Sequence, residues 1–214
     1  MKHLLSIEAM DAEAIETILK NAAVIKEQRG DSQHQPLAGQ TWAMIFTKSS
    51  TRTRVSFEVG IRELGGSVMF LNANDMQLGR GEPIKDTARV LGLMVHGAVI
   101  RTYAQDDVEQ FAEWSAIPTI NALTDTEHPC QIITDIFTYQ ELRGPIDGKI
   151  VTFVGDGACN VPISWIWAAN KLNFELRIAA PKAYQPCPDL LAKAGGKITV
   201  TEDFNAAAEG ADLL

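Results

Sequence analysis

The hydrophobic residues of this chain recur with helical spacing in some segments and as short continuous runs in others. Residues 15–25 show the helical spacing, and Asp11 before them is suited to cap a helix. Residues 41–46 form a continuous apolar run that ends before Lys48 and predicts a buried strand. Helical spacing returns over residues 55–64 and stops at a pair of glycines, which is a common way to end a helix.

Strand and helix patterns continue to alternate along the rest of the chain. Further strands are expected over residues 67–71, 98–102, 149–154, 176–180 and 197–201. Further helices are expected over residues 86–95, 131–142, 161–170 and 189–194. Residues 211–214 have the pattern of one more strand that is beginning. This alternation predicts an α/β fold in which each central sheet is mainly parallel and flanked by helices.

A domain boundary is expected where the helix over residues 131–142 meets Gly144 and Pro145. A proline and the residue before it both disfavour helix, so this helix would end there and bridge two α/β units in tandem. The first domain is assigned to residues 1–143 and the second to residues 144–214. The second domain is expected to be incomplete, because a strand pattern begins in its last residues.

Composition and charge narrow the class of protein. Of the 214 residues, 46% are hydrophobic and 21% are charged, which is typical of a globular protein with a substantial core. The formal net charge of −8 would repel nucleic acids and anionic membranes. The sequence has neither the pattern of a secretory signal nor an apolar segment long enough to span a bilayer. A cytoplasmic protein is expected, in which an anionic ligand would need a local cluster of positive groups.

The spacing of cysteines and histidines predicts neither a disulfide framework nor a metal site. The cysteines lie far apart without a C-x-x-C pair, so reduced thiols are expected. The histidines also lack the spacing of metal ligands. These residues are Cys130, Cys159, Cys187, His3, His34, His96 and His128.

A turn rich in hydroxyl and guanidinium groups joins the strand over residues 41–46 to the helix that follows it. The turn reads Ser49-Ser50-Thr51-Arg52-Thr53-Arg54. A phosphate is favoured at a helix N-terminus, where hydroxyls can donate to its oxygens and Arg52 can bind it with two N–H groups. A Ser/Thr helix cap with solvated arginines is the commoner explanation of such a motif in isolation. The position after a strand favours a ligand site, because ligands of α/β sheets bind beyond the carboxyl ends of strands.

Two further segments are expected to supply polar groups. Arg101 closes a predicted strand and would emerge at the same carboxyl edge, although a lone arginine there is more often a salt-bridge partner. His128 precedes Pro129, which is well suited to the first turn of the next helix. His128 and Gln131 could then point at the carbonyl and amide of a small ligand, whereas a His-Pro turn by itself more often only marks where a helix begins.

Together these segments resemble the carbamoyl phosphate site of the aspartate and ornithine carbamoyltransferase family in kind, order and spacing. They are Ser-Thr-Arg-Thr-Arg at residues 50–54, Arg101 and His-Pro-Cys-Gln at residues 128–131. The similarity runs along the whole chain. The resemblance implies that the residues that bind carbamoyl phosphate are Ser50, Thr51, Arg52, Thr53, Gln77, Arg101, His128, Pro129, Cys130 and Gln131.

Other features are similar to the ornithine branch of this family. Residues 77–90 resemble its intersubunit loop and the following helix, which implies that Gln77 reaches the site of a neighbouring subunit in a homotrimer. Without the resemblance, Gln77 would be interpreted as an ordinary loop residue. Residues 153–160 resemble the turn that holds the ornithine backbone, which implies that Asn160 contacts L-ornithine. The family commonly has Asn where Cys159 and Ile163 stand, and its later Asp-x-x-x-Ser-Met-Gly and His-Cys-Leu-Pro segments do not occur in this sequence.

The resemblance implies transfer of a carbamoyl group from carbamoyl phosphate to the side-chain amine of L-ornithine, giving L-citrulline and phosphate, within arginine metabolism. Arg52, Arg101 and His128 would be the catalytic residues, and no metal or organic cofactor is required. Three alternatives remain open: a carbamoyltransferase for putrescine, aspartate or an acylated ornithine, a dinucleotide-binding dehydrogenase domain, and a catalytically silent homologue. The dehydrogenase fits less well, because the G-x-G at residues 155–157 lacks the third glycine of that motif.

Overall fold

The computed structural model describes residues 3–30, 33–72 and 81–214. The chain divides into two compact units, one made of Met1–Leu5 and Lys20–Asp125 and the other of Ser6–Leu19 and Thr126–Leu214. Helix α1 (Ala12–Glu27) contributes to both units. Asp11 caps this helix as predicted, since its carboxylate accepts a hydrogen bond of 2.7 Å from Ala14 N. The domain boundary at residues 143 and 144 stays a prediction.

The first unit contains a four-stranded parallel sheet in the order β2-β1-β3-β4. Its strands are β1 (Thr41–Phe46), β2 (Ser67–Asn72), β3 (Gly97–Arg101) and β4 (Thr119–Leu123). Phe46 is in register with Asn72 on one side and with Arg101 on the other. Three strands therefore end at the same level, and the residues that follow them share one edge of the sheet.

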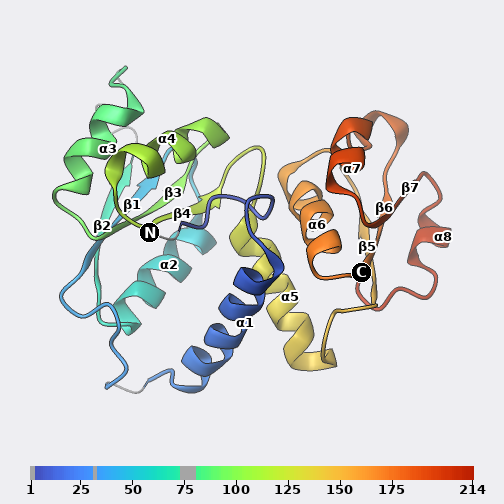
Figure 1. The fold of residues 1–214 in the computed structure, drawn as a ribbon, viewed down its shortest axis with the longest axis horizontal. Helices are drawn as coiled ribbons and strands as arrows, with labels where there is room; N and C mark the ends of the chain where they lie inside the picture. The colour runs from blue at the N-terminus through green and yellow to red at the C-terminus, as the bar shows by residue number, and fades with distance from the viewer. Residues whose placement is uncertain (1–2, 31–32, 73–80) are drawn as a thin grey trace. The chain divides into compact units, whose positions relative to one another are not determined.

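Helices cover both faces of this sheet, as the ribbon in Figure 1 shows. Helices α3 (Ile84–Gly92) and α4 (Gln105–Ser115) pack on one face, where Ala88 and Phe111 join a core with Ile45. Helix α2 (Thr51–Glu63) packs on the other face, where Ile61 lies in a core with Met44. The buried positions of the strands alternate between these two cores, which is the period expected of a sheet covered on both sides.

The second unit contains a three-stranded parallel sheet in the order β5-β6-β7. Its strands are β5 (Ile150–Val154), β6 (Glu175–Ala179) and β7 (Lys197–Thr201). Leu213 forms a parallel bridge with Val151, in agreement with the strand pattern expected at residues 211–214. The accompanying helices are α5 (Pro129–Arg143), α6 (Asn160–Lys171), the short 3-10 helix η3 (Lys182–Tyr184), α7 (Pro188–Ala194) and α8 (Phe204–Ala208).

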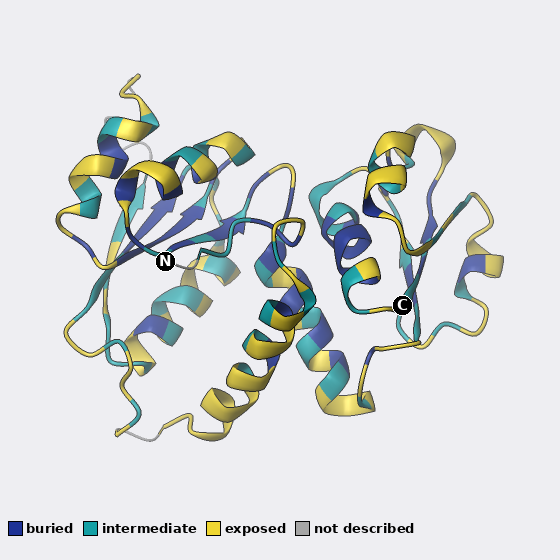
Figure 2. Ribbon diagram, viewed as in Figure 1, coloured by how far each residue is buried: buried dark blue, intermediate teal, exposed yellow. Residues whose placement is uncertain are grey.

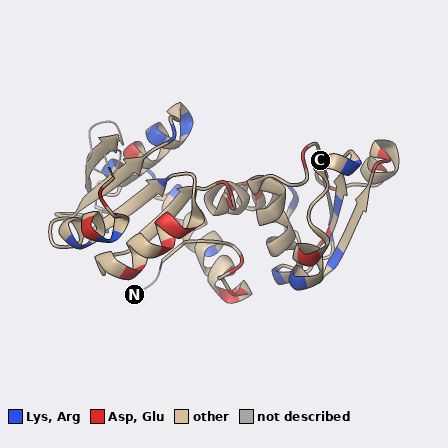
Figure 3. Cartoon of the chain, turned by 90° about the horizontal axis from the view of Figure 1, so that it is seen from above, with Lys and Arg blue, Asp and Glu red and all other residues tan. Residues whose placement is uncertain are grey.

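Burial follows the layers of each unit. Figure 2 shows buried residues concentrated in the strands and on the sheet-facing sides of helices. In the second unit, Trp165 of α6 packs edge-on against Phe174 with 5.6 Å between ring centroids, and both side chains are buried. Charged residues of both signs are interspersed over each unit (Figure 3). None of the helices in the described ranges combines the length and apolar character that crossing a bilayer requires.

The prediction of an α/β fold with two parallel sheets flanked by helices is confirmed. Each of the six strands expected between residues 41 and 201 is present, with ends that differ by at most one residue, whereas residues 211–214 form only the isolated bridge at Leu213. The sequence analysis did not predict strand β4. It also did not predict helix α4, although the buried residues Val108, Phe111, Ala112 and Ser115 of this helix follow helical spacing. Helix α8 was also not predicted, because a helix of one turn leaves little periodicity to detect.

Candidate functional site

Ser50 caps helix α2 at the point where the chain leaves strand β1. Its backbone is extended, and its hydroxyl oxygen accepts a hydrogen bond of 3.3 Å from Thr53 N. The same hydroxyl donates to Thr53 Oγ1 at 3.0 Å. The cap fixes the first turn of α2, whose free N–H groups and positive dipole end are suited to bind an anion.

Arg101 reaches this turn from the end of strand β3. Its Nη1 lies 3.4 Å from Thr53 Oγ1, so the guanidinium and the two hydroxyls form one cluster. Burial lowers the pKa of Arg101 from its ordinary value, although the group stays a cation at neutral pH. Its Nε is buried and has no hydrogen-bond partner within the part of the chain that the structure describes. A buried donor without an acceptor is costly, which favours a ligand oxygen at this place.

A pocket of about 640 Å³ lies beside this cluster. It is lined by the turn before α2 and by residues at the carboxyl ends of the neighbouring strands, among them Asn72. Lys48 and Arg54 give it two positive charges. Lys48 forms an ion pair with Asp125 and lies 4.3 Å from the centre of the Tyr103 ring.

Two side chains of this pocket were not assigned a role from the sequence. Arg54 stacks its guanidinium 3.7 Å from the centre of the Phe70 ring and forms an ion pair of 3.8 Å with Glu58. Lys48 is only 20% exposed, so its charge is held at the pocket instead of extending into water. Its place two residues after a buried strand and two residues before the Ser50 cap is the signal that could have identified it.

The remaining predicted residues of this turn are more open to solvent. Thr51 is exposed and lines the pocket. Arg52 is exposed in the first turn of α2 and does not line the pocket. Gln77 lies outside the described residues. The structure therefore brings Ser50, Thr53 and Arg101 into direct contact and leaves Arg52 exposed outside this cluster.

The His-Pro-Cys-Gln segment opens helix α5 in the second unit. His128 occupies the cap position and Pro129 the first turn, as the sequence predicts. Gln131 Nε2 donates to Asp135 Oδ1 at 2.8 Å, one turn later on the same helix. This bond orients the Gln131 amide so that its carbonyl oxygen remains available to accept a hydrogen bond. Burial raises the pKa of the Cys130 thiol to about 12, so this residue is a neutral thiol at physiological pH.

Asn160 begins helix α6 after the turn at residues 155–157. The turn packs tightly, since a Cβ atom on Gly157 would lie 2.7 Å from Ile178 Cγ2. Cys159 precedes Asn160, and its thiol contacts Asp156 O at 3.3 Å. Burial, with a smaller contribution from the charge of Asp156, raises the pKa of Cys159. Because a Cβ atom at residue 157 would lie so close to Ile178, a glycine is required there for close packing. This packing explains the G-x-G sequence at residues 155–157 without a bound dinucleotide.

His128 and Asn160 are joined through one buried side chain. Ser164 Oγ accepts a hydrogen bond of 2.9 Å from His128 N and lies 3.0 Å from Asn160 O. The sequence analysis did not single out Ser164. The Ser50, Thr53 and Arg101 cluster belongs to the first unit, and His128, Asn160 and Ser164 belong to the second.

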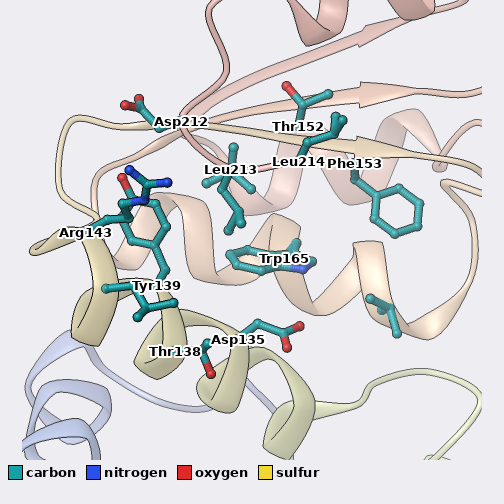
Figure 4. A pocket seen from close by; sticks show the side chains of 13 residues that line it. Asp135, Thr138, Tyr139, Arg143, Thr152, Phe153, Trp165, Asp212, Leu213 and Leu214 are labelled. Carbon is teal, nitrogen blue, oxygen red and sulfur yellow. The ribbon is translucent and has the colours of Figure 1, made fainter.

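A second pocket, of about 570 Å³, lies in the second unit and contains none of the predicted site residues. Figure 4 shows Tyr139 and Trp165 among the side chains that line it, with Leu213 and Leu214 close by. Its walls are mainly aromatic and aliphatic, and its charged residues Asp135, Arg143 and Asp212 are not gathered around one point (Figure 4). Among the described residues there is also no group of three or more His, Cys, Asp or Glu side chains that could hold a metal ion.

Comparison with known proteins gives matches along the whole chain. Residues 2–141 match the family described as aspartate/ornithine carbamoyltransferase, carbamoyl-P binding domain, and residues 147–214 match its Asp/Orn binding domain. The ornithine carbamoyltransferase of Akkermansia muciniphila is 59% identical over 191 residues, which are 88% of this chain and 63% of that protein. The ornithine carbamoyltransferase of Halorhodospira halophila is 48% identical over 215 residues, covering 100% of this chain and 71% of that protein.

This chain belongs to the ornithine carbamoyltransferase family. The solved structure of ornithine carbamoyltransferase from Burkholderia thailandensis E264 superposes with a TM-score of 0.93 at 45% identity, covering 99% of this chain and 73% of that one. The enzyme from Pyrococcus furiosus superposes with a TM-score of 0.91 at 42% identity, covering 99% of this chain and 70% of that one. The predicted family is confirmed, and the matched residues of this chain cover between 63% and 73% of the length of these relatives.

Proposed function

We propose that this ornithine carbamoyltransferase family member transfers the carbamoyl group of carbamoyl phosphate to the side-chain amine of L-ornithine, giving L-citrulline and phosphate. The observation that carries the proposal is the cluster of Ser50, Thr53 and Arg101 at the N-terminus of α2. The buried Nε of Arg101 in this cluster has no hydrogen-bond acceptor among the described residues, so it could donate to a ligand oxygen. The names of the relatives support ornithine as the amine.

The first part of the proposed site holds the phosphate. Ser50 and Thr51 would donate hydroxyl hydrogens to its oxygens, the Ser50 hydroxyl turning away from Thr53 Oγ1 to do so, while the N–H groups of the first turn of α2 supply further donors. Arg52, exposed beside them, would fold over the bound anion with two parallel N–H groups. Lys48 and Arg54 add positive charge to the pocket, which favours entry of a dianion into a protein whose net charge is −8.

The second part stabilises the carbonyl oxygen of the carbamoyl group. Negative charge grows on this oxygen as the amine attacks, and donors fixed in advance lower the barrier most effectively. Thr53, Arg101 and His128 are the proposed donors, and Gln131 would accept from the carbamoyl NH₂ through the oxygen that Asp135 leaves available. Pro129 and Cys130 would line the site through the fixed first turn of α5. The proposal assigns no step to a metal or an organic cofactor.

Asn160 would hold the backbone of L-ornithine from the start of α6. Family members commonly have Asn at the positions of Cys159 and Ile163, so the amine is the part of the proposal that most needs a direct assay. Putrescine, aspartate and an acylated ornithine are the competing amines. Carbamoylation of each amine, followed under identical conditions, identifies the substrate; turnover of another amine in preference to ornithine would overturn this part of the proposal.

The assembly is proposed to be a homotrimer in which Gln77 of one subunit reaches the site of its neighbour. A mixture of Arg52→Ala and Gln77→Ala subunits tests this arrangement, because some mixed trimers would contain one site with both native residues. Partial recovery of activity on mixing supports a shared site, and sedimentation analysis gives the number of subunits.

The domain boundary between residues 143 and 144 and the location in the cytoplasm also remain predictions from the sequence.

A calorimetric titration of carbamoyl phosphate into the purified 214-residue chain tests the first substrate. Arg52→Ala should weaken binding at least tenfold, whereas Arg62→Ala, which removes an exposed arginine from the last turn of the same helix, should leave it unchanged. Loss of one donor to the transition state typically costs about 3–4 kcal/mol, so turnover should fall by orders of magnitude in Arg52→Ala. Absence of binding to the folded wild-type chain would refute the proposed function.

A further inference from the structure

A buried carboxylate and a buried hydroxyl connect the two turns that are proposed to bind the substrates in the second unit. Glu127 immediately precedes His128 and is 1% exposed. Ser164 lies one helical turn after Asn160 and is 0% exposed. Ser164 Oγ lies 3.2 Å from Glu127 Oε2, so the two side chains contact each other. Neither residue has a role in the function proposed above.

Glu127 fixes its own segment to the N-terminal part of the chain. Its Oε2 accepts a hydrogen bond of 2.7 Å from Ile7 N, and its Oε1 accepts one of 3.3 Å from Glu8 N. Both oxygens are therefore used, which holds the carboxylate in one orientation. Burial raises the pKa of Glu127, since the three hydrogen bonds offset only part of the cost of removing the charge from water.

Ser164 connects this fixed carboxylate to both turns. Its oxygen accepts from His128 N at 2.9 Å, and its single hydrogen lies within reach of Glu127 Oε2 at 3.2 Å and of Asn160 O at 3.0 Å. The hydrogen can be donated to only one of these acceptors at a time. A shift of the His128 turn that moved Ser164 Oγ would therefore change whether this hydrogen is donated to Glu127 or to the first turn of α6.

We propose that Glu127 and Ser164 are positioning residues that hold the carbamoyl-binding turn at His128 in a fixed relation to the ornithine-binding turn at Asn160. This inference rests on the proposed function, because it concerns how the same two subsites are kept in register. The stability of the fold does not require the buried pair of Glu127 and Ser164. Replacing buried hydrogen-bonded groups by apolar groups of similar shape is often neutral or stabilising, whereas a buried carboxylate with directed bonds defines one geometry.

The test compares two variants that each remove one buried hydroxyl from the second unit. Ser164→Ala removes the acceptor of His128 N. Thr152→Val is the matched control, because Thr152 is also buried and its hydroxyl donates to Ala207 O at 2.7 Å, away from both turns. Hydrogen exchange at the His128 amide, the dissociation constant of carbamoyl phosphate and the melting temperature are measured for the wild type and both variants.

The positioning role predicts a specific pattern. Ser164→Ala should speed exchange of the His128 amide and weaken carbamoyl phosphate binding, each at least tenfold, whereas Thr152→Val should leave both within twofold while lowering the melting temperature by a similar amount. Equal effects of the two variants on exchange and binding would mean that Ser164 only stabilises the fold. Unchanged binding in Ser164→Ala would also overturn the role, although the proposed function would stand. If the wild type fails to bind carbamoyl phosphate, both proposals fall.

Two substitutions of Glu127 complete the test. Glu127→Gln keeps the shape and one acceptor oxygen for Ile7 N and Ser164, so carbamoyl phosphate binding should stay within threefold of the wild type. Glu127→Leu removes every acceptor and should weaken binding at least tenfold. Similar binding by the two folded variants would contradict the inference.

If Ser164→Ala does not fold, Ser164→Cys, with a weaker acceptor of similar size, replaces it in the test. This variant should lose part of the affinity for carbamoyl phosphate, and binding at the wild-type level would overturn the role.

Discussion

Arg101 and Thr53 are 48 residues apart in sequence, and the structure places Arg101 Nη1 3.4 Å from Thr53 Oγ1. Thr53 Oγ1 also accepts from the Ser50 hydroxyl at 3.0 Å, so one oxygen lies between a cation and a helix cap. The register of strands β1 and β3 produces this contact, because Phe46 and Arg101 are paired at the carboxyl ends of the two strands. The helix proposed to bind phosphate and the guanidinium proposed to bind the carbonyl oxygen are thus fixed to the same sheet.

Replacement of Arg101 by methionine should remove most of the affinity for carbamoyl phosphate. Methionine fills similar space but offers no N–H donor, and a hydrogen bond to a charged group is worth about 1.5–3 kcal/mol, which corresponds to roughly 10- to 100-fold in the dissociation constant. Calorimetric titration measures this loss. Arg62→Met removes an equal charge from an exposed position and should bind normally. Equal affinity of the Arg101 variant and the wild type would exclude Arg101 from the site.

Substitutions of Ser50 should separate helix capping from anion binding. Ser50→Ala loses the acceptor for Thr53 N and should lower the free energy of unfolding by about 1 kcal/mol. Ser50→Asp keeps a capping acceptor and should retain stability, while its negative charge repels phosphate from the same pocket. Urea denaturation and calorimetric titration of both variants check these outcomes. Carbamoyl phosphate binding by Ser50→Asp at the wild-type level would show that the anion lies elsewhere.

The three cysteines should react with thiol reagents in a fixed order. Cys187 is exposed, whereas burial raises the pKa of Cys159 and raises that of Cys130 to about 12. Because the thiolate is the reactive form, iodoacetamide at pH 8 should modify Cys187 first and Cys130 last. Peptide mass spectrometry after timed labelling gives the order. Rapid modification of Cys130 in the folded protein would contradict the burial seen at the start of α5.

Strands such as β1 could be predicted from the sequence because their continuous apolar runs are buried on both faces of a parallel sheet. Strand β4, in which polar Thr119 and Asn121 interrupt the apolar run, was not predicted. The turn at residues 50–54 was also recognisable, since its hydroxyls and guanidinium groups are adjacent in sequence. Helix α4 was missed even though Val108 and Phe111 carry a periodic signal, because no distinctive cap precedes them.

Contacts between distant residues could not be predicted in this way. The ion pair of Lys48 with Asp125 joins residues 77 positions apart, and the Ser164 contact with Glu127 spans 37. Apart from Lys48, these side chains have an ordinary sequence context, and the role of each depends on which strands are neighbours and how helices pack on them. Sequence motifs therefore identified the groups proposed to touch the ligands, while the groups that orient them emerged only from the fold.

The stability of the protein should show a pH dependence that originates from Glu127. Burial, reinforced by the nearby charge of Glu8, raises the pKa of Glu127 above its ordinary value of 4.5 in the folded state. The folded state then binds a proton more tightly than the unfolded state does, so the stability contributed by protonation is complete below about pH 4.5 and is lost as pH rises through the folded-state pKa. Glu127→Gln cannot titrate and lacks this contribution.

The free energy of unfolding of the wild type minus that of Glu127→Gln should therefore decrease as pH rises from 4.5 towards 8. Other carboxylates titrate in both proteins, so their effects cancel in the difference. Urea denaturation at several pH values measures it. A difference that increases with pH would mean that the hydrogen bonds from Ile7, Glu8 and Ser164 outweigh burial, and that Glu127 is held as a carboxylate by its donors.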